Sequence, residues 1–218
     1  MLRILMIGAP LLMMPLFWLA LQFELTARMT RWMVSENRPV EMLTFLFGAV
    51  GGIGGLIFAR RLRAAGAHGL VVAFYGLFAL LLFFVAMEEI AWGQQLFKFS
   101  TPEAWREINV QGETTLHNLA GMQGNNGYLR AVFGLGGLVG VALNLWPRFR
   151  PVAPPTILLS WFLVIAVHSL VRIATMHTVP VDSPFDVLLR LSAEVIELMI
   201  VFAASVFLYT KSRELLPS

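Results

Sequence analysis

The sequence has no cysteine and few charged residues, and both shortages narrow what the protein can be. Without cysteine among its 218 residues, the chain can form no disulfide, thiolate metal site or iron–sulfur cluster, and it has no cysteine nucleophile. Charged residues make up 13% of the chain and apolar residues 58%, whereas soluble globular domains carry roughly 25% charged residues. The composition therefore excludes an ordinary soluble domain and predicts an integral membrane protein.

Apolar runs divide the chain into about six stretches, each long enough to cross a bilayer as a helix of about twenty residues. We therefore predict an all-α fold, a polytopic transmembrane helical bundle that forms one domain over residues 1–218. The first run is too long for the core of a signal peptide and has no small-residue cleavage site, so we expect it to be retained as a span. The predicted spans cover residues 2–23, 40–60, 69–97, 128–147, 155–177 and 184–210.

Two connections carry helical signals of their own. Residues 24–41 mix both charges with apolar residues at helical spacing, which predicts an amphipathic helix at the membrane interface. Thr101-Pro102-Glu103 combines a capping residue, a proline for the first helical position and an acidic first turn, and Ser183-Pro184 repeats this pattern before the last span. A short interfacial helix is expected after residue 101.

Glycines gather in the second and fourth predicted spans. Gly48 and Gly52 are four residues apart, as are Gly51 and Gly55, and the pair Gly136 and Gly140 repeats the spacing. Small residues at this interval let helix backbones approach closely in membranes. We therefore interpret the glycines as packing surfaces and not as a phosphate-binding loop.

Basic residues lie at the ends of the apolar runs and form no stripe with interleaved aromatics, so nucleic-acid binding is not expected despite a pI near 9.8. With six spans, three basic segments fall on one side of the membrane. The excess of lysine and arginine in cytoplasmic loops then predicts that both termini are cytoplasmic and that connections 98–127 and 178–183 face outward. The basic segments are 60–63, 148–150 and 211–213.

Polar side chains interrupt three of the spans. Residues 70–87 are almost wholly apolar and run directly into Glu88 and Glu89. In the fifth span, His168 and Arg172 lie four residues apart. In the sixth span, residues 186, 190, 194 and 197 form one polar stripe along the helix. Such residues are costly in lipid and must face protein or water. A count of about 1.5 Å per residue places them at a similar depth, which predicts one outward-opening polar pocket.

This pocket suggests roles for its members. Two or three histidines with a carboxylate are sufficient to hold a catalytic metal, which predicts His117, His168 and His177 as ligands of Zn²⁺ or another divalent metal. A glutamate beside such a metal is the usual general base, so Glu88, Glu89 and Glu194 are the candidate catalytic residues. The candidate substrate-binding residues are Arg172 and Arg190, which suit an anionic headgroup, with Trp92, Gln95, Gln111, Glu113 and Asn118.

The run Glu88-Glu89-Ile90-Ala91-Trp92-Gly93-Gln94, followed by Asn109-x-Gln111-Gly112-Glu113 and His117-Asn118, resembles the signature of a family of uncharacterised bacterial multispanning membrane proteins. The resemblance covers about thirty residues at the centre of the chain and implies a bacterial inner (plasma) membrane location, without implying a reaction. The arrangement of ligands is also faintly similar to alkaline-ceramidase and adiponectin-receptor type membrane hydrolases. This chain departs from them in having six spans and Glu194 and Glu197 in the last one.

Three functions remain open at this level. The first is an integral membrane enzyme, a metal-dependent hydrolase, that acts on a lipid or lipid-linked substrate in the outward pocket. The second is a non-catalytic membrane subunit or lipid-binding protein whose polar cluster is a structural ion network, with a protein partner or as a homo-oligomer. The third is a proton-coupled transporter, against which the apolar inner halves of the spans argue.

Overall fold

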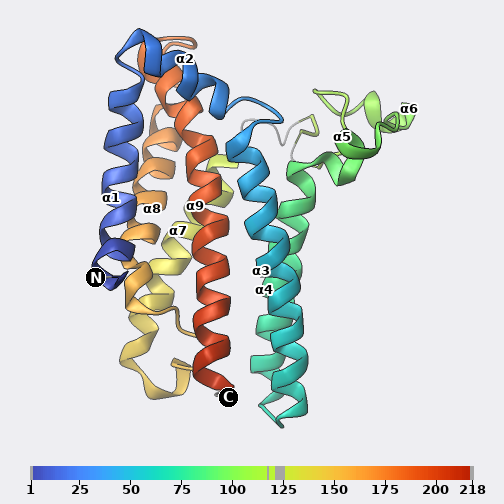
Figure 1. Cartoon of the computed structure of the whole chain (residues 1–218), viewed down its shortest axis with the longest axis vertical. Helices are drawn as coiled ribbons and strands as arrows, with labels where there is room; N and C mark the ends of the chain where they lie inside the picture. The colour runs from blue at the N-terminus through green and yellow to red at the C-terminus, as the bar shows by residue number, and fades with distance from the viewer. Residues whose placement is uncertain (1, 117, 121–125, 217–218) are drawn as a thin grey trace.

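The computed structural model describes residues 2–116, 118–120 and 126–216, and this part of the chain is helical throughout its regular structure. Six of its helices are long and apolar enough to cross a membrane, so the chain is a multi-pass membrane protein and the predicted all-α bundle is confirmed (Figure 1). They are α1 (Leu2–Ala20), α3 (Pro39–Ala64), α4 (Gly69–Glu89), α7 (Asn126–Ala142), α8 (Leu159–Thr175) and α9 (Pro184–Leu215).

Shorter elements lie between the six long helices. The predicted interfacial helix is α2 (Glu24–Met33), which buries none of its residues. The predicted short helix after Thr101 is α6 (Glu103–Arg106), although Pro102 is its N-cap and the Thr101 side chain bonds elsewhere. The Ser183 hydroxyl caps α9 as predicted, since it accepts from the Asp186 amide at 3.3 Å. The remaining short elements are η1 (Ala91–Gly93), α5 (Gln94–Phe97), η2 (Leu143–Leu145), η3 (Pro147–Phe149) and η4 (Thr156–Leu158).

The third predicted span was too long. We expected one helix over 69–97, but α4 ends at Glu89. Three consecutive residues shortly after it have a positive φ, namely Ala91 (47°), Trp92 (56°) and Gly93 (88°). A right-handed helix cannot continue through left-handed backbone, so the chain turns away from the α4 axis. Glu88 and Glu89 therefore occupy the last turn of the span, and the polar residues after them belong to the connection.

Helix α9 is the central element of the bundle. It packs against α3 on one side and against α8 and α1 on the other, while α4 packs chiefly on α3 and α7 chiefly on α8. Figure 1 shows this order from α1 through α9 to α4, with α5 and α6 projecting beyond the end of α4. The arrangement leaves α4 and α7 on either side of α9, which matters for the site described below.

Glycines allow close helix contacts, as predicted for Gly48 and Gly52, but the prediction was wrong for Gly136, which has nothing within 4 Å of its Cβ position. A Cβ atom placed on Gly48 would lie 2.8 Å from Ala86 of α4, and one on Gly52 would lie 2.7 Å from Phe83. A Cβ atom on Gly137 of α7 would lie 2.2 Å from the Phe162 ring of α8. These separations are too short for a side chain, so each glycine is required for the backbones to approach.

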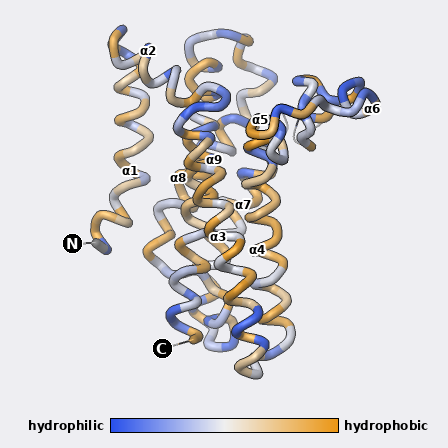
Figure 2. The backbone as a smooth tube through the Cα atoms, turned by 45° about the vertical axis from the view of Figure 1, so that its right-hand side comes forward, coloured by the Kyte–Doolittle hydropathy of each residue, from blue (hydrophilic) through white to orange (hydrophobic). Residues whose placement is uncertain are grey.

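Apolar residues dominate the lengths of the helices, and polar residues collect at the two ends (Figure 2). The end that holds the C-terminus carries the basic segments 60–63, 148–150 and 211–213, while the opposite end carries α2, α5 and α6. This distribution is the one expected of helices that cross the hydrocarbon layer with their connections in water.

Candidate functional site

Glu88 holds the turn and the loop that follow α4. One carboxylate oxygen accepts from the Trp92 indole at 2.6 Å, and the other accepts from the Leu116 amide at 2.6 Å. The residue is 6% exposed, so these charge-assisted bonds replace the water that the buried carboxylate would otherwise need. Glu88 thus ties the end of α4 to a backbone position 28 residues further along the chain.

Gln94 makes a second connection between the same two segments. Its side-chain oxygen accepts from the Thr114 amide at 2.9 Å, and its nitrogen donates to the Thr101 hydroxyl at 2.8 Å. That hydroxyl in turn donates to the Gly112 carbonyl at 2.6 Å. The loop is therefore held by polar side chains in place of regular secondary structure.

Asn109 organises the other half of this loop. Its side-chain oxygen accepts from the amides of Gln111 and Glu113, both at 3.1 Å, while its nitrogen donates to the Thr115 carbonyl at 2.7 Å. The Asn118 side chain donates to the side-chain oxygen of Gln111. The residues of the family-like signature thus bind largely to one another, and they build a cap at the end of α4.

Beneath the cap lies a polar cavity of about 190 Å³, which we call the polar chamber. It is lined from α3, α4, α7, α9, the connection between α2 and α3, and the cap, so residues far apart in sequence converge there. Seven of the lining side chains are glutamates, and one, Arg130, is basic. The lining residues are Val34, Glu36, Glu41, Glu88, Glu89, Gln111, Glu113, Asn118, Asn126, Arg130, Glu194 and Glu197.

Arg130 of α7 and Glu197 of α9 form an ion pair across the chamber. The Arg130 Nε lies 3.0 Å from the Glu197 Oε1, and a terminal guanidinium nitrogen donates to the same oxygen at 2.5 Å. The two side chains are 14% and 25% exposed, so the pair is largely withdrawn from solvent. It fixes the distance between two helices that otherwise make few contacts at this level.

Glu89 and Glu194 also line the chamber, and they are half-buried. Within the part of the chain that the structure describes, neither carboxylate accepts a hydrogen bond or forms an ion pair. Glu89 lies within electrostatic range of Glu194, Glu197 and Arg130. These two glutamates are therefore carboxylates of the chamber that are left available to a bound molecule.

An apolar groove opens beside the chamber, between α4 and α7 with α9 behind it, and we call it the lateral groove. Its part nearest the chamber has a volume of about 330 Å³ and includes Phe84, Leu129 and Phe133. A second hollow of about 330 Å³ follows along the same helices, and Phe133 lines both. Leu129 and Val132 are 64% and 69% exposed, so the groove faces outward from the bundle.

The chamber and the lateral groove share part of their walls. Glu88, Glu89, Asn126, Arg130 and Glu197 line both. The polar end and the apolar length therefore form one amphipathic space, with carboxylates where the two meet. This junction is the candidate site.

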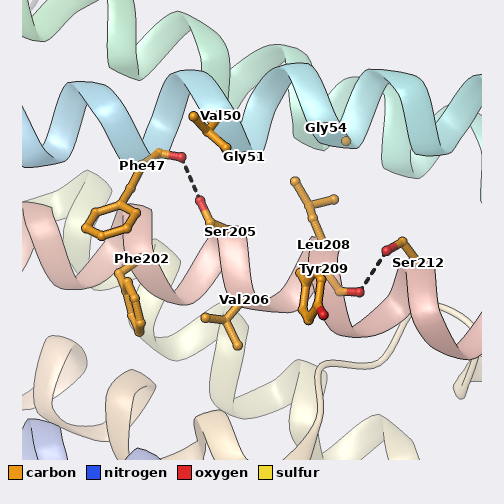
Figure 3. Close-up of a pocket in the computed structure, with 11 residues that line it drawn as sticks. Phe47, Val50, Gly51, Gly54, Phe202, Ser205, Val206, Leu208, Tyr209 and Ser212 are labelled. Atoms are coloured by element: carbon orange, nitrogen blue, oxygen red, sulfur yellow. Dashed lines mark hydrogen bonds between the residues drawn. The ribbon is translucent and has the colours of Figure 1, made fainter.

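A hollow of similar size between α3 and α9 offers no such chemistry (Figure 3). It has a volume of about 360 Å³ and is lined mainly by apolar residues and glycines. The Ser205 hydroxyl in it donates to the Phe47 carbonyl at 2.9 Å, and the Ser212 hydroxyl donates to the Tyr209 carbonyl at 2.8 Å. The hydroxyl hydrogens of both serines are thus already used within the protein.

Several residues predicted for the pocket lie elsewhere. His168 lines a different hollow, between α1, α8 and α9, and is not among the chamber residues. Arg172 pairs with Asp186 at 2.7 Å, and Arg190 pairs with Asp182 at 2.5 Å and with Asp186 at 3.3 Å. These contacts use both arginines to join the adjoining ends of α8 and α9. Depth along the membrane was a poor guide, because it does not say which side of α9 a residue faces.

The predicted metal ligands are not gathered by the described residues. His177 is exposed in the turn after α8, and His168 lies in its own hollow. Among the described residues, no three side chains of histidine, aspartate or glutamate are close enough together to hold a metal ion. His117 and the side chain of Gln95 lie outside the described part of the chain.

The other predicted substrate-binding residues have structural contacts. Trp92 donates to Glu88 and packs edge-on against Phe84, whereas Gln111, Glu113 and Asn118 do line the chamber. The prediction missed Arg130, although a lone arginine inside an apolar span is itself a sign of a functional or paired position. It also missed Glu36, Glu41 and Asn126, which no motif marks.

No protein-family model matches the chain, and comparisons with curated proteins and with solved structures find no match.

Proposed function

We propose that this membrane protein binds an amphipathic lipid or lipid-linked molecule, with its headgroup in the polar chamber and its acyl part in the lateral groove. The single observation that supports this is the shared wall, in which Glu89, Arg130 and Glu197 line both spaces. A soluble metabolite would need only the chamber, and a purely apolar molecule would need only the groove. A ligand that is polar at one end and apolar along its length matches both.

The chamber favours a headgroup rich in hydrogen-bond donors. Ionised carboxylates only accept hydrogen bonds, and Glu89 and Glu194 have no donor among the described residues. Hydroxyl groups of a sugar or polyol, or an amine, supply such donors. The anionic headgroup expected from Arg172 and Arg190 is less suitable, because those arginines pair with aspartates outside the chamber.

Glu89 and Glu194 would also support catalysis on this headgroup. A carboxylate without hydrogen bonds can take a proton from a hydroxyl group or water, which makes Glu89 and Glu194 the proposed acid–base pair. Arg130 lies close enough to stabilise negative charge that develops on the substrate. We assign the protein on this basis to the transferases or hydrolases of lipid headgroups.

The orientation is also part of the proposal. The basic segments lie at the end opposite the chamber, which by the positive-inside rule supports our proposal that both termini are cytoplasmic and that the chamber faces outward. We propose a bacterial inner membrane as the location. The substrate would then be drawn from the outer leaflet.

Mass spectrometry of lipids retained by the protein purified in mild detergent tests this proposal. We expect a defined lipid class with the wild type, and loss of that class with Val132→Trp, which fills the lateral groove. Val50→Trp is the matched control, because Val50 is similarly exposed, at 63%, but lines the hollow of Figure 3. Retention of the same lipids by both variants would overturn the proposal.

A non-catalytic lipid-binding protein is the second candidate. The buried hydrogen bonds of Glu88 and the Arg130–Glu197 ion pair favour it, since both lock the fold without leaving a reactive group. Glu89→Gln and Glu194→Gln separate the two functions. Catalysis is supported if the wild type converts the retained lipid and the two variants accumulate it unchanged. Binding alone is supported if the wild type and both variants retain the identical lipid.

A further inference from the structure

A further hollow, which shares no lining residue with the chamber, contains an unsatisfied histidine. It lies between α1, α8 and α9, has a volume of about 360 Å³, and is lined almost entirely by apolar side chains. We call it the histidine pocket. Its walls include Leu11, Pro15 and Trp18 of α1, Val164 and His168 of α8, and Leu189 of α9.

His168 is 6% exposed, and neither of its ring nitrogens has a hydrogen-bond partner in the described part of the chain. The Leu189 carbonyl lies near the ring, but not in the geometry of a hydrogen bond. A neutral imidazole has one donor and one acceptor nitrogen, so a single carbonyl can serve only one of them. Buried polar groups are normally paired, and an unpaired one costs about 1–3 kcal/mol.

A backbone acceptor lies in the same wall. Pro15 has no N–H, so the Leu11 carbonyl loses the donor that a regular helix would give it. The equivalent loss at Pro10 is repaired, because the Trp161 indole donates to the Met6 carbonyl at 2.7 Å. No side chain of the described residues makes the corresponding bond to Leu11.

Neighbouring polar groups are already satisfied within the protein. The Trp18 indole donates to the Ser192 hydroxyl at 2.8 Å, and that hydroxyl donates to the Leu188 carbonyl at 2.7 Å. The Ser169 hydroxyl, next to His168, donates to the Ile165 carbonyl at 2.7 Å. The imidazole is therefore the polar side-chain group that the pocket offers to a guest, and Leu11, in the same wall, adds a carbonyl without its regular helical donor.

We propose that the histidine pocket binds a neutral lipid with a free hydroxyl group, which hydrogen-bonds to His168 while the apolar body lies along α1 and α8. A hydroxyl both donates and accepts, so it can pair with either imidazole nitrogen and with the Leu11 carbonyl. A neutral headgroup is favoured over a charged one, because none of the pocket's lining side chains carries a formal charge with which a charged group could pair. This site is separate from the chamber and does not depend on the function proposed for it.

Photolabelling tests the proposal with the full chain in phosphatidylcholine nanodiscs and a diacylglycerol that carries a diazirine on one acyl chain. We expect labelled peptides from residues 10–18 and 163–171. Unlabelled diacylglycerol should compete at a concentration about fivefold lower than its O-methyl ether, the ratio expected from one hydrogen bond. This comparison uses the wild type and needs no variant to fold.

Two variants and a control complete the experiment. His168→Leu should weaken the preference for the free hydroxyl, because only the Leu11 carbonyl then remains to pair with it, and Val164→Trp should abolish labelling of this pocket while it keeps the histidine. His177→Leu, which changes an exposed histidine, should leave both unchanged. The proposal would be overturned by labelling confined to other surfaces, by equal competition from the alcohol and the ether, or by an undiminished hydroxyl preference in His168→Leu. A density map that shows only water against His168 would also overturn it.

Discussion

Glu88 and Glu89 are adjacent in the sequence, yet their carboxylates have different surroundings. Glu88 accepts two short hydrogen bonds, from the Trp92 indole and the Leu116 amide. Glu89 accepts none among the described residues and lines the junction of the polar chamber and the lateral groove. One acid therefore maintains the architecture, and the other is left for a ligand.

Stability measurements on Glu88→Gln and Glu89→Gln should separate these roles. Glu88→Gln replaces one accepting oxygen with a donor and leaves a buried partner unpaired, so we expect a loss of about 1–3 kcal/mol in the free energy of unfolding. Glu89→Gln should leave stability unchanged or raise it. Thermal unfolding in detergent measures both, and equal losses would contradict the division of roles.

Two adjacent glycines in α7 test the helix packing. Gly137→Ala would place a Cβ atom 2.2 Å from the Phe162 ring, and overpacking of this kind costs about 1–3 kcal/mol. Gly136→Ala is the matched control, because nothing lies within 4 Å of its Cβ position and alanine favours the helix. Thermal unfolding should show Gly137→Ala clearly less stable than Gly136→Ala, and the reverse order would show that α7 and α8 pack differently.

Hydrogen exchange tests the construction of the cap. Gln94→Ala removes the acceptor of the Thr114 amide, so that amide should exchange faster, by roughly tenfold for about 1.4 kcal/mol of lost protection. Protection along α4 should not change, since its backbone bonds are internal to the helix. Mass-spectrometric exchange of peptides from both regions measures this, and unchanged exchange near residue 114 would exclude the Gln94 bond.

The ion pair between Arg130 and Glu197 should be coupled energetically. A double-mutant cycle with Arg130→Gln and Glu197→Gln should give an interaction energy of about 0.5–3 kcal/mol. The pair Arg190 and Asp182 provides the comparison, because its side chains are 45% and 75% exposed and exposed pairs contribute about 1 kcal/mol or less. A weaker coupling at Arg130 than at Arg190 would contradict the burial of the first pair.

The sequence predicted the fold better than the site. Apolar run lengths identify spans, and Gly48 and Gly52 mark a packing face, because both follow from local composition and spacing. The end of α4 escaped prediction, since Ala91 and Trp92 adopt left-handed backbone that neither residue type favours. Tertiary contacts imposed by the cap decide that turn.

The site depended on rotation about helix axes, which the sequence does not fix for a bundle. His168 and Glu194 were expected to meet because they lie at similar depth, but they line different hollows. Arg130, which does reach the chamber, belongs to a span that looked purely structural. The signature residues were correctly selected as unusual, although most of them, such as Asn109 and Gln94, bind the loop itself.

A density map of the protein in a lipid nanodisc tests the two-part site most directly. The account predicts continuous density in which a polar end lies within hydrogen-bonding distance of Glu89 or Glu194 and an apolar tail passes Phe133 between α4 and α7. Lipid density spread evenly around all the helices, with only water in the chamber, would contradict it.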